Sequence, residues 1–195
     1  MTSSSTKKIH LIRHAESEHN VAWKLYGDVI WTDMKYKNPP LTPTGQQQAG
    51  ELYKHQELYK VDAVYVSPAQ RTLETARIIY PNGFMEAHDA LLEFSPGRIV
   101  NRRDPRNVIE DEWPGIHLDD VSDSVPAEEE EADHNFEERL RNFIHSVLIT
   151  DYKSVAVVTH HDVIRKIWQI VFPEQPFPGI VNGDYITLNL SGNWS

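Results

Sequence analysis

The stretch Leu11-Ile12-Arg13-His14-Ala15-Glu16-Ser17-Glu18-His19-Asn20 decides the fold of this chain. Its first residues, together with Ile9, form an apolar run that is typical of a buried strand. The polar residues that follow predict a helix with Ser17 as its N-cap and Gly27 at its end. In α/β folds, a strand end beside a helix N-terminus is a place where anions bind. An Arg-His pair at such a place could hold a phosphate group or attack one.

Arg13 and His14 also have a simpler interpretation. In most proteins a lone histidine beside an apolar run is a core residue, and a neighbouring arginine is an ion-pair partner. For the dipeptide alone this simpler interpretation is preferred. Evidence for a functional pair therefore has to come from the rest of the chain.

Length and composition indicate one globular domain that spans residues 1–195. The mass is 22.5 kDa, with 39% hydrophobic and 25% charged residues, which is an ordinary composition for a soluble protein. The chain contains no cysteine, which excludes disulfides and thiolate metal sites. No apolar run is long enough to cross a membrane, and Met1–Lys8 lacks the apolar core of a signal peptide, so we expect a cytosolic (cytoplasmic) protein.

The net charge of −10 argues against non-specific binding to nucleic acid, which needs a basic face. This charge also repels small anions at long range, so binding of a phosphate ester would need a local cluster of cations. The acidic residues 128–131 carry part of the charge. We expect them in a solvated loop or in the first turn of a helix, without a catalytic role.

A second predicted strand end carries another cation. Residues 61–66 alternate and are β-branched, as in a strand, and Ser67 and Pro68 are typical of an N-cap and the first position of a helix. Arg71 would then lie in the first helical turn, at the same edge of the sheet as His14. Because the helix dipole is positive there, an arginine is favourable only if an anion lies between the two.

A third predicted strand end carries a second histidine. Ser154–Thr159 is a near-continuous apolar run, which is typical of a central strand buried on both faces. It ends at His160, and a helix is predicted to follow directly, so the arrangement around His14 is repeated. The other predicted elements are helices that begin at Thr42 and Asn135, strands at 84–87 and 185–190, and a partly buried loop at 28–43 that either connects elements or forms one wall of a pocket.

Glu93 is a candidate proton donor because large apolar residues, Leu92 and Phe94, flank it. Such surroundings should desolvate the carboxyl group and raise its pKa. The alternative is a carboxylate at a strand end that faces water.

Residues 97–126 are predicted to form a long irregular segment. Loops of this length more often have a function than serve only as a connection. Four arginines gather near its start: Arg98, Arg102, Arg103 and Arg106. These cations could bind a second phosphate or carboxylate group of a substrate, or they could pair with the acidic run at 128–131. Arg102 and Arg103 are the candidate substrate-binding residues.

Taken together, these residues make the chain resemble the histidine phosphatase superfamily, which has the phosphoglycerate mutase-like fold. Four motifs of that family occur in the family's order: Arg13-His14-Ala15-Glu16-Ser17 with Asn20, Ser67-Pro68 with Arg71-Thr72 and Thr75-Ala76, Leu91-Leu92-Glu93, and Val158-Thr159-His160 with Ile164-Arg165. The segment Leu41-Thr42-Pro43-Thr44-Gly45-Gln46 matches a further family pattern. The resemblance implies a three-layer α/β/α sandwich around a mostly parallel central sheet.

Two residues depart from the family pattern. Ala15 stands where glycine is usual, and His161 stands where glycine or another small residue often follows the catalytic histidine. Both are tolerable if the local backbone stays at negative φ. His161 adds an imidazole near the expected pocket, where it could alter substrate preference or simply point outward.

The resemblance implies two-step phosphoryl transfer that needs no metal and no other cofactor. His14 would attack the phosphorus and Glu93 would protonate the leaving oxygen. Water would then hydrolyse the phosphohistidine, with Glu93 as the base. For the attack, His14 must be neutral at the attacking nitrogen, so its other nitrogen should donate to a backbone carbonyl.

The remaining site residues are implied by the same resemblance. Arg13, Arg71 and His160 would surround the phosphoryl oxygens and stabilise the charge of the transition state. Asn20 would add a neutral hydrogen bond. Three further histidines are predicted to be incidental: His10, His19 and His88.

Three functions fit this expectation. The preferred one is a phosphatase for a small phosphorylated metabolite, that is, a metal-independent phosphoric monoester hydrolase of the histidine acid phosphatase type. The second is phosphoglycerate mutase-type transfer, for which the chain is shorter than a cofactor-dependent enzyme should be. The third is a non-catalytic module that binds a phospho-ligand. Such a module should have lost one of the five expected active-site residues, and all are present: Arg13, His14, Arg71, Glu93 and His160.

Overall fold

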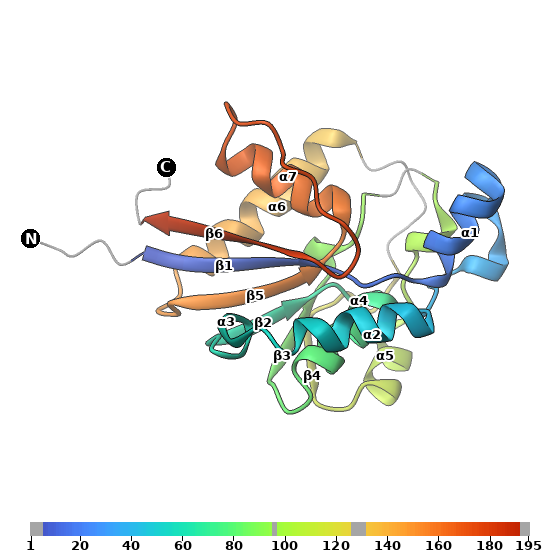
Figure 1. The fold of residues 1–195 in the computed structure, drawn as a ribbon, viewed down its shortest axis with the longest axis horizontal. Helices are drawn as coiled ribbons and strands as arrows, with labels where there is room; N and C mark the ends of the chain where they lie inside the picture. Colours follow the sequence, from blue (N-terminus) through green and yellow to red (C-terminus); the bar gives the residue numbers. More distant parts are fainter. Residues whose placement is uncertain (1–5, 95–96, 126–131, 192–195) are drawn as a thin grey trace, which may run out of the picture.

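A six-stranded sheet runs through the molecule in the order β4-β3-β2-β5-β1-β6 (Figure 1). The computed structural model describes residues 6–94, 97–125 and 132–191. Within this part of the chain, β1 to β5 are parallel to one another, and β6 pairs antiparallel with β1 at one edge. The strands are β1 (Thr6–Arg13), β2 (Ala63–Val66), β3 (Met85–His88), β4 (Ile116–Asp120), β5 (Ser154–Thr159) and β6 (Tyr185–Ser191).

β5 confirms the prediction of a central strand buried on both faces. Val155 and Val157 pack into the core on one face of the sheet, and Ala156 and Val158 pack into the core on the other. β5 pairs with β1 on one side and with β2 on the other. Because these three strands are parallel, the residues that follow them meet at one edge of the sheet.

Helices cover both faces of the sheet, which confirms the three-layer α/β/α sandwich (Figure 1). α6 and α7 pack on one face, and α2, α3, α4 and α5 pack on the other. The helices are α1 (Glu18–Tyr26), α2 (Pro43–Leu52), α3 (Gln56–Tyr59), α4 (Gln70–Ile79), α5 (Arg106–Glu112), α6 (Asp133–Leu148) and α7 (His161–Val171), with 3₁₀ helices η1 (Gly27–Thr32), η2 (Met34–Tyr36), η3 (Asp89–Leu91) and η4 (Ile99–Asn101). Among these helices of the described residues, none combines the length and the apolar character that a membrane span requires.

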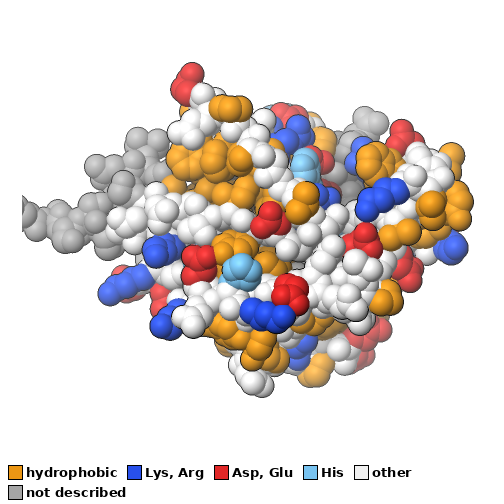
Figure 2. All heavy atoms as spheres, in the orientation of Figure 1, with side chains coloured by type: hydrophobic (Ala, Val, Ile, Leu, Met, Phe, Trp, Pro, Cys, Tyr) orange, Lys and Arg blue, Asp and Glu red, His pale blue; other side chains and the backbone are white. Residues whose placement is uncertain are grey.

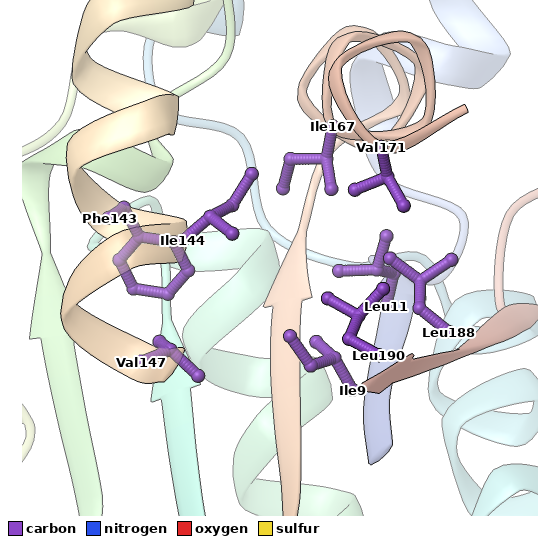
Figure 3. Close-up of a pocket in the computed structure, with 9 residues that line it drawn as sticks. All are labelled: Ile9, Leu11, Phe143, Ile144, Val147, Ile167, Val171, Leu188 and Leu190. Atoms are coloured by element: carbon purple, nitrogen blue, oxygen red, sulfur yellow. The ribbon is translucent and has the colours of Figure 1, made fainter. Parts of the chain in front are cut away.

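Apolar side chains fill the core between α6, α7 and the sheet (Figure 3). Ile9 and Leu11 of β1, with Leu188 and Leu190 of β6, face side chains from both helices. Together they enclose a cavity of about 10 Å³ with a lining that is apolar throughout. That volume is at the lower limit of the space for one water, and its lining offers a water no hydrogen-bond partner. The cavity is a packing gap and not a ligand site.

The start of α4 corrects one prediction. The helix begins at Gln70 with Ala69 as its N-cap, and not at the Ser67-Pro68 pair. The Ser67 hydroxyl lies 2.8 Å from Nε2 of His160, so this oxygen is engaged in a different hydrogen bond. Arg71 still lies in the first turn of α4, as predicted.

The segment 97–126 also differs from the prediction. Its described part, residues 97–125, contains α5 and β4, and β4 pairs in parallel with β3 in the main sheet. The segment therefore contributes two elements to the sandwich and is not irregular throughout. Both elements are short and rich in charged residues, so their apolar periodicity is weak. The acidic run at 128–131 lies outside the described residues.

α1 and the segment 28–43 form a unit at the end of the molecule that lies beyond the carboxyl ends of β1 and β5 (Figure 1). Ile30 and Tyr36 are buried against Ala22 and Val100, which confirms a partly buried segment. Figure 2 shows hydrophobic side chains on the surface at this end of the molecule, and the exposed ones of this unit are Trp23, Leu25, Tyr26, Val29 and Met34. The predicted start and end of α1 are confirmed, with Ser17 as N-cap and Gly27 as C-cap at φ 70°.

Candidate active site

The residues that follow β1, β2 and β5 meet at the carboxyl edge of the sheet. His14 comes directly after β1 and His160 directly after β5, and the centroids of their rings lie 5.2 Å apart. The backbone N–H of His14 donates to the carbonyl of Thr159 at 2.9 Å, which holds the two strand ends side by side. Arg71, in the first turn of α4, contacts His160. The structure thus brings together three residues that the sequence predicts from separate motifs.

His14 is buried, and its ring has one defined tautomer. Nδ1 lies 2.8 Å from the carbonyl oxygen of Ala15, which can only accept, so Nδ1 carries the proton. Nε2 therefore keeps its lone pair. Burial lowers the pKa of His14 well below 6.5, and the charges of Arg71 and Arg13 lower it further. His14 is neutral at neutral pH, with Nε2 available as a nucleophile.

His160 also has a defined tautomer, because Arg71 can only donate. Nη2 of Arg71 lies 3.1 Å from Nδ1 of His160, so Nδ1 is the acceptor and Nε2 carries the proton. Nε2–H then donates to the hydroxyl of Ser67 at 2.8 Å. Burial, with the nearby charge of Arg71, lowers the pKa of His160 well below 6.5. In this structure both ring nitrogens are engaged within the protein, so a direct bond from His160 to a phosphoryl oxygen would require the ring to exchange a partner.

Arg71 and Arg13 present buried donors that have no partner. Arg71 donates from Nη1 to Val100 O at 3.0 Å and from Nη2 to Asn101 Oδ1 at 2.9 Å. Arg13 donates from Nη1 to Ile180 O at 2.9 Å. Within the described residues, Nε of each guanidinium is buried and makes no hydrogen bond. Burial lowers the pKa of Arg71 to about 10, which leaves it charged at neutral pH.

Unpartnered charged donors of this kind are rare in folded proteins. A buried N–H without an acceptor has lost its hydrogen bonds to water and has gained none within the protein. Guanidinium groups match the oxygens of phosphate and carboxylate groups. The charges of Arg13 and Arg71, which both act on His14, make this edge of the sheet favourable for an anion.

Glu93 supplies the carboxyl group of the site. It follows η3 and is half-buried; its Oε1 accepts from Phe94 N at 3.0 Å and its Oε2 from Asp162 N at 3.3 Å. Burial raises the pKa of Glu93, and the charge of Asp162 raises it further, against the opposing charge of Arg71. This direction confirms the prediction drawn from its apolar neighbours. A carboxyl group with a raised pKa is suited to donate a proton.

The segment after His14 is held by the start of α2. Thr42 N donates to Glu16 O at 3.0 Å, and Glu16 N donates to Gln48 Oε1 at 2.8 Å. At Gly45 a Cβ atom would lie 1.9 Å from the Glu16 carbonyl oxygen, so only glycine permits this approach. The Leu41–Gln46 segment thus has a physical role, which is to fix the backbone beside the nucleophile.

The loop before β6 holds the other side of the nucleophile, and the sequence motifs did not reveal it. Gly183 N and Asn182 Nδ2 donate to the carbonyl oxygen of His14, at 3.2 Å and 3.1 Å. The backbone N–H of Arg13 donates to Asp184 O at 3.0 Å. An Asn-Gly pair predicts a turn, but its contact with β1 depends on β6 lying next to β1.

α1 contributes one expected and one unexpected residue. Asn20 lies in the first turn of α1, half-buried. His19, predicted to be incidental, is buried with its ring centroid 5.9 Å from that of His14. Nothing local in the sequence indicates this position, because a single polar residue in a short helix gives no sign of the side on which it lies.

Arg103 is not placed as a substrate-binding residue. It is buried, its Nε lies 2.7 Å from Oδ1 of Asp89, and its Nη2 donates to the carbonyls of Ser122 and Ser124. Its hydrogen bonds connect η3 to the segment that follows β4, so its role is structural. Arg102 is half-buried directly after η4 and remains a candidate.

Replacing Arg103 with methionine is expected to destabilise the fold and leave KM unchanged. The change leaves the Asp89 carboxylate, which is 20% exposed, without its partner, and it should cost about 3 kcal/mol in the free energy of unfolding, near the lower end for a buried pair. Urea denaturation measures this cost. The matched control is Arg106→Met, whose partner Asp123 is 97% exposed and for which the cost should stay below about 1 kcal/mol. A raised KM with unchanged stability would restore the substrate-binding role.

His161 lies beside the site, at the first residue of α7. Its Nδ1 is 3.1 Å from Oδ1 of Asp162, and its ring centroid is 5.8 Å from that of Phe177. Its side chain is 39% exposed. Within the described residues, no group of three or more His, Cys, Asp or Glu side chains could hold a metal ion.

Comparison with known proteins points to one family. The sequence pattern of the histidine phosphatase superfamily (branch 1) matches residues 9–180. Over 165 residues the chain is 28% identical to the "Putative phosphoserine phosphatase 2" of Hydrogenobacter thermophilus, a match that covers 83% of this chain and 76% of that protein. Over 74 residues it is 43% identical to a phosphoglycerate mutase-like protein of Arabidopsis thaliana; this match covers 36% of the chain and only 27% of that longer protein.

Among solved structures, phosphoglycerate mutase from Bacillus anthracis str. Sterne has the same fold. The TM-score is 0.66 at 16% sequence identity, and the match covers 97% of this chain and 90% of that one. At this identity the likeness concerns the fold alone, and it confirms the predicted phosphoglycerate mutase-like architecture.

Proposed function

Because the chain belongs to branch 1 of the histidine phosphatase superfamily, a family of phosphatase-type enzymes, we propose that it is a phosphatase that hydrolyses a small phosphorylated metabolite through a phosphohistidine intermediate on His14. It is a phosphoric monoester hydrolase of the histidine acid phosphatase type, acts without a metal ion and works in the cytosol.

One observation carries this proposal. The lone pair on Nε2 of His14 lies in the same site as two buried guanidinium groups with unpartnered Nε–H donors, those of Arg13 and Arg71. A nucleophile flanked by unpartnered cationic donors suits a tetrahedral anion that carries an electrophilic centre. The arginines supply the positive charge that a metal ion supplies in other phosphoryl-transfer enzymes.

In the first step, Nε2 of His14 forms a bond to phosphorus and the ester P–O bond breaks. Glu93 gives its proton to the leaving oxygen, a role that its raised pKa favours. Arg13 and Arg71 stabilise the charge on the phosphoryl oxygens, and His160 holds Arg71 in place through Nδ1.

In the second step, water attacks the phosphohistidine. The Glu93 carboxylate, now unprotonated, accepts a proton from that water as its oxygen bonds to phosphorus. The N–P bond breaks, and both inorganic phosphate and neutral His14 are released.

The phosphatase is preferred over the mutase because the match to the protein named as a phosphoserine phosphatase covers 83% of this chain. The likeness to a mutase structure is at 16% identity and does not extend to activity. Arg102, which follows Asn101 in the chain, and His161, which follows His160, are proposed to contact the part of the substrate beyond the phosphoryl group.

A phosphate-release screen tests this function. The panel includes phosphoserine, 2- and 3-phosphoglycerate and p-nitrophenyl phosphate, with and without EDTA, and it includes a readout for interconversion of the two phosphoglycerates. We expect phosphate release from p-nitrophenyl phosphate and from at least one metabolite, at equal rates with the chelator. Complete inhibition by EDTA would contradict metal independence, and interconversion faster than hydrolysis would establish the mutase instead.

A further inference from the structure

Ser17, His19 and Asn20 form a closed ring of hydrogen bonds beside the nucleophile. Nδ1 of His19 lies 2.7 Å from the Ser17 hydroxyl, and that hydroxyl lies 2.9 Å from Oδ1 of Asn20. Nδ2 of Asn20 lies 3.2 Å from Nε2 of His19 and closes the ring. The motif comparison assigns His19 no role.

The direction of every bond in this ring follows from one backbone donor. The N–H of Ser17 lies 3.0 Å from Oδ1 of Asn20, and an N–H can only donate, so this atom of the amide is the oxygen. The amide nitrogen therefore faces Nε2 of His19, which must accept. Nδ1 of His19 then carries the proton and donates to Ser17, whose hydroxyl donates to Asn20. This closed ring of hydrogen bonds can form only when His19 is neutral.

Asn182 connects this ring of hydrogen bonds to the nucleophile, His14. Nδ2 of Asn182 donates to the carbonyl of His14 at 3.1 Å and to Oδ1 of Asn20 at 3.3 Å. Oδ1 of Asn20 thus accepts from Ser17 and Asn182, and its lone pairs are used. One hydrogen on Nδ2 of Asn20 points to His19, and the other makes no hydrogen bond within the described residues.

The surroundings of His19 hold its imidazole ring in one position. It is 6% exposed, and its ring centroid lies 5.9 Å from that of His14 and 6.3 Å from that of Trp31. Burial and the charges of Arg71 and Arg13 lower its pKa well below 6.5, which favours the neutral form that the ring requires. A residue that only filled space here would not need two hydrogen-bonding nitrogens.

We propose that His19 is a positioning residue: by accepting a hydrogen bond from Nδ2 of Asn20, it fixes the amide so that the remaining N–H binds the phosphoryl group at His14. This inference rests on the proposed function of the site. It assigns a specific task to a histidine that the sequence motifs leave unexplained, and it makes Asn20 effective only while Nε2 of His19 is unprotonated.

A double-mutant cycle between His19 and Asn20 tests the proposal. His19→Leu should lower kcat for p-nitrophenyl phosphate about 10- to 100-fold with little change in KM, because a misaligned donor acts mainly in the transition state. Asn20→Ala should have a similar effect, and the double variant should be no slower than the slower single variant. His19→Gln, whose amide oxygen can still accept from Asn20, should stay within about threefold of the wild type in kcat.

The matched control is His10→Leu. His10 is also a buried histidine with two hydrogen bonds, to Thr187 and Ser154, but it lies in the middle of β1. This variant should lower thermal stability and leave kcat unchanged. Additive effects of His19→Leu and Asn20→Ala, or a His19→Gln enzyme as slow as His19→Leu, would overturn the proposal.

Two further measurements do not depend on turnover. Orthovanadate affinity, measured by calorimetry, should follow the same non-additive cycle. A long-range ¹H–¹⁵N correlation spectrum of the wild type should show His19 with its proton on Nδ1, and a proton on Nε2 would contradict the ring. If the wild type hydrolyses no phosphate ester, the proposed function fails, while these two measurements still decide the role of His19.

Discussion

Replacing His14 with alanine is expected to abolish phosphatase turnover, with kcat lowered about 10⁴- to 10⁶-fold, the range for loss of a covalent nucleophile. Within the described residues, no other histidine of the site has a ring nitrogen that is free to replace it. His160 is the nearest candidate, but its Nδ1 accepts from Arg71 and its Nε2 carries the proton. Steady-state hydrolysis of p-nitrophenyl phosphate measures the loss.

A matched variant separates chemistry from folding. In His14→Asn the side-chain N–H can still reach the carbonyl of Ala15, as Nδ1 does at 2.8 Å, but no atom replaces Nε2. It should be as inactive as His14→Ala while it unfolds close to the wild-type temperature. Substantial turnover by either variant would refute the assignment of the nucleophile.

The second large effect is expected at Glu93, and it depends on the leaving group. Glu93→Gln should lower kcat about 10²- to 10⁴-fold for an alkyl phosphate such as phosphoserine, because the leaving alkoxide then receives no proton. For p-nitrophenyl phosphate the first step should be much less affected, because p-nitrophenolate leaves without protonation. Phosphoenzyme should therefore accumulate in this variant only with good leaving groups.

The control for this prediction is Glu86→Gln, which removes a half-buried carboxylate on β3. It should leave kcat unchanged for both substrates. A Glu93→Gln enzyme in which kcat/KM, which reports the phosphorylation step, falls equally for the two substrates would indicate that Glu93 does not protonate the leaving group.

The pH dependence follows from the directions of two pKa shifts. Turnover needs His14 neutral, and its pKa is lowered well below 6.5, so the site keeps its nucleophile into the acidic range. It also needs Glu93 protonated, and the pKa of Glu93 is raised above 4.5. For an alkyl phosphate, kcat/KM should therefore fall as the pH rises through the pKa of Glu93, and this fall should disappear in Glu93→Gln, which does not titrate.

The part of the site that could be predicted from the sequence lies at the ends of strands. Arg13, His14, Arg71 and His160 each follow or end an apolar run, and the carboxyl ends of neighbouring parallel strands converge. Local pattern was therefore enough to place these residues together. The raised pKa of Glu93 was predictable for a similar reason, since its apolar neighbours are adjacent in the chain.

The residues that escaped prediction have partners far away in the chain. Arg103 reaches Asp89 and Ser122, 14 and 19 residues away, and nothing local distinguishes it from Arg102. Asn182 contacts His14 across 168 residues. β4 was missed because Ile116 and Leu118 are its only apolar residues, so its periodicity is weak. Long-range pairing decides these positions, and apolar periodicity carries no information about it.

The central claim, that His14 becomes covalently phosphorylated, is tested most directly by trapping the intermediate. Wild-type enzyme is mixed with p-nitrophenyl phosphate, quenched in alkali within milliseconds to preserve phosphohistidine, digested and analysed by mass spectrometry. We expect one phosphoryl group on the peptide that contains His14, bound to Nε2, and none in His14→Asn. A phosphoryl group on another residue, or full turnover with no phosphoenzyme at any time point, would contradict it.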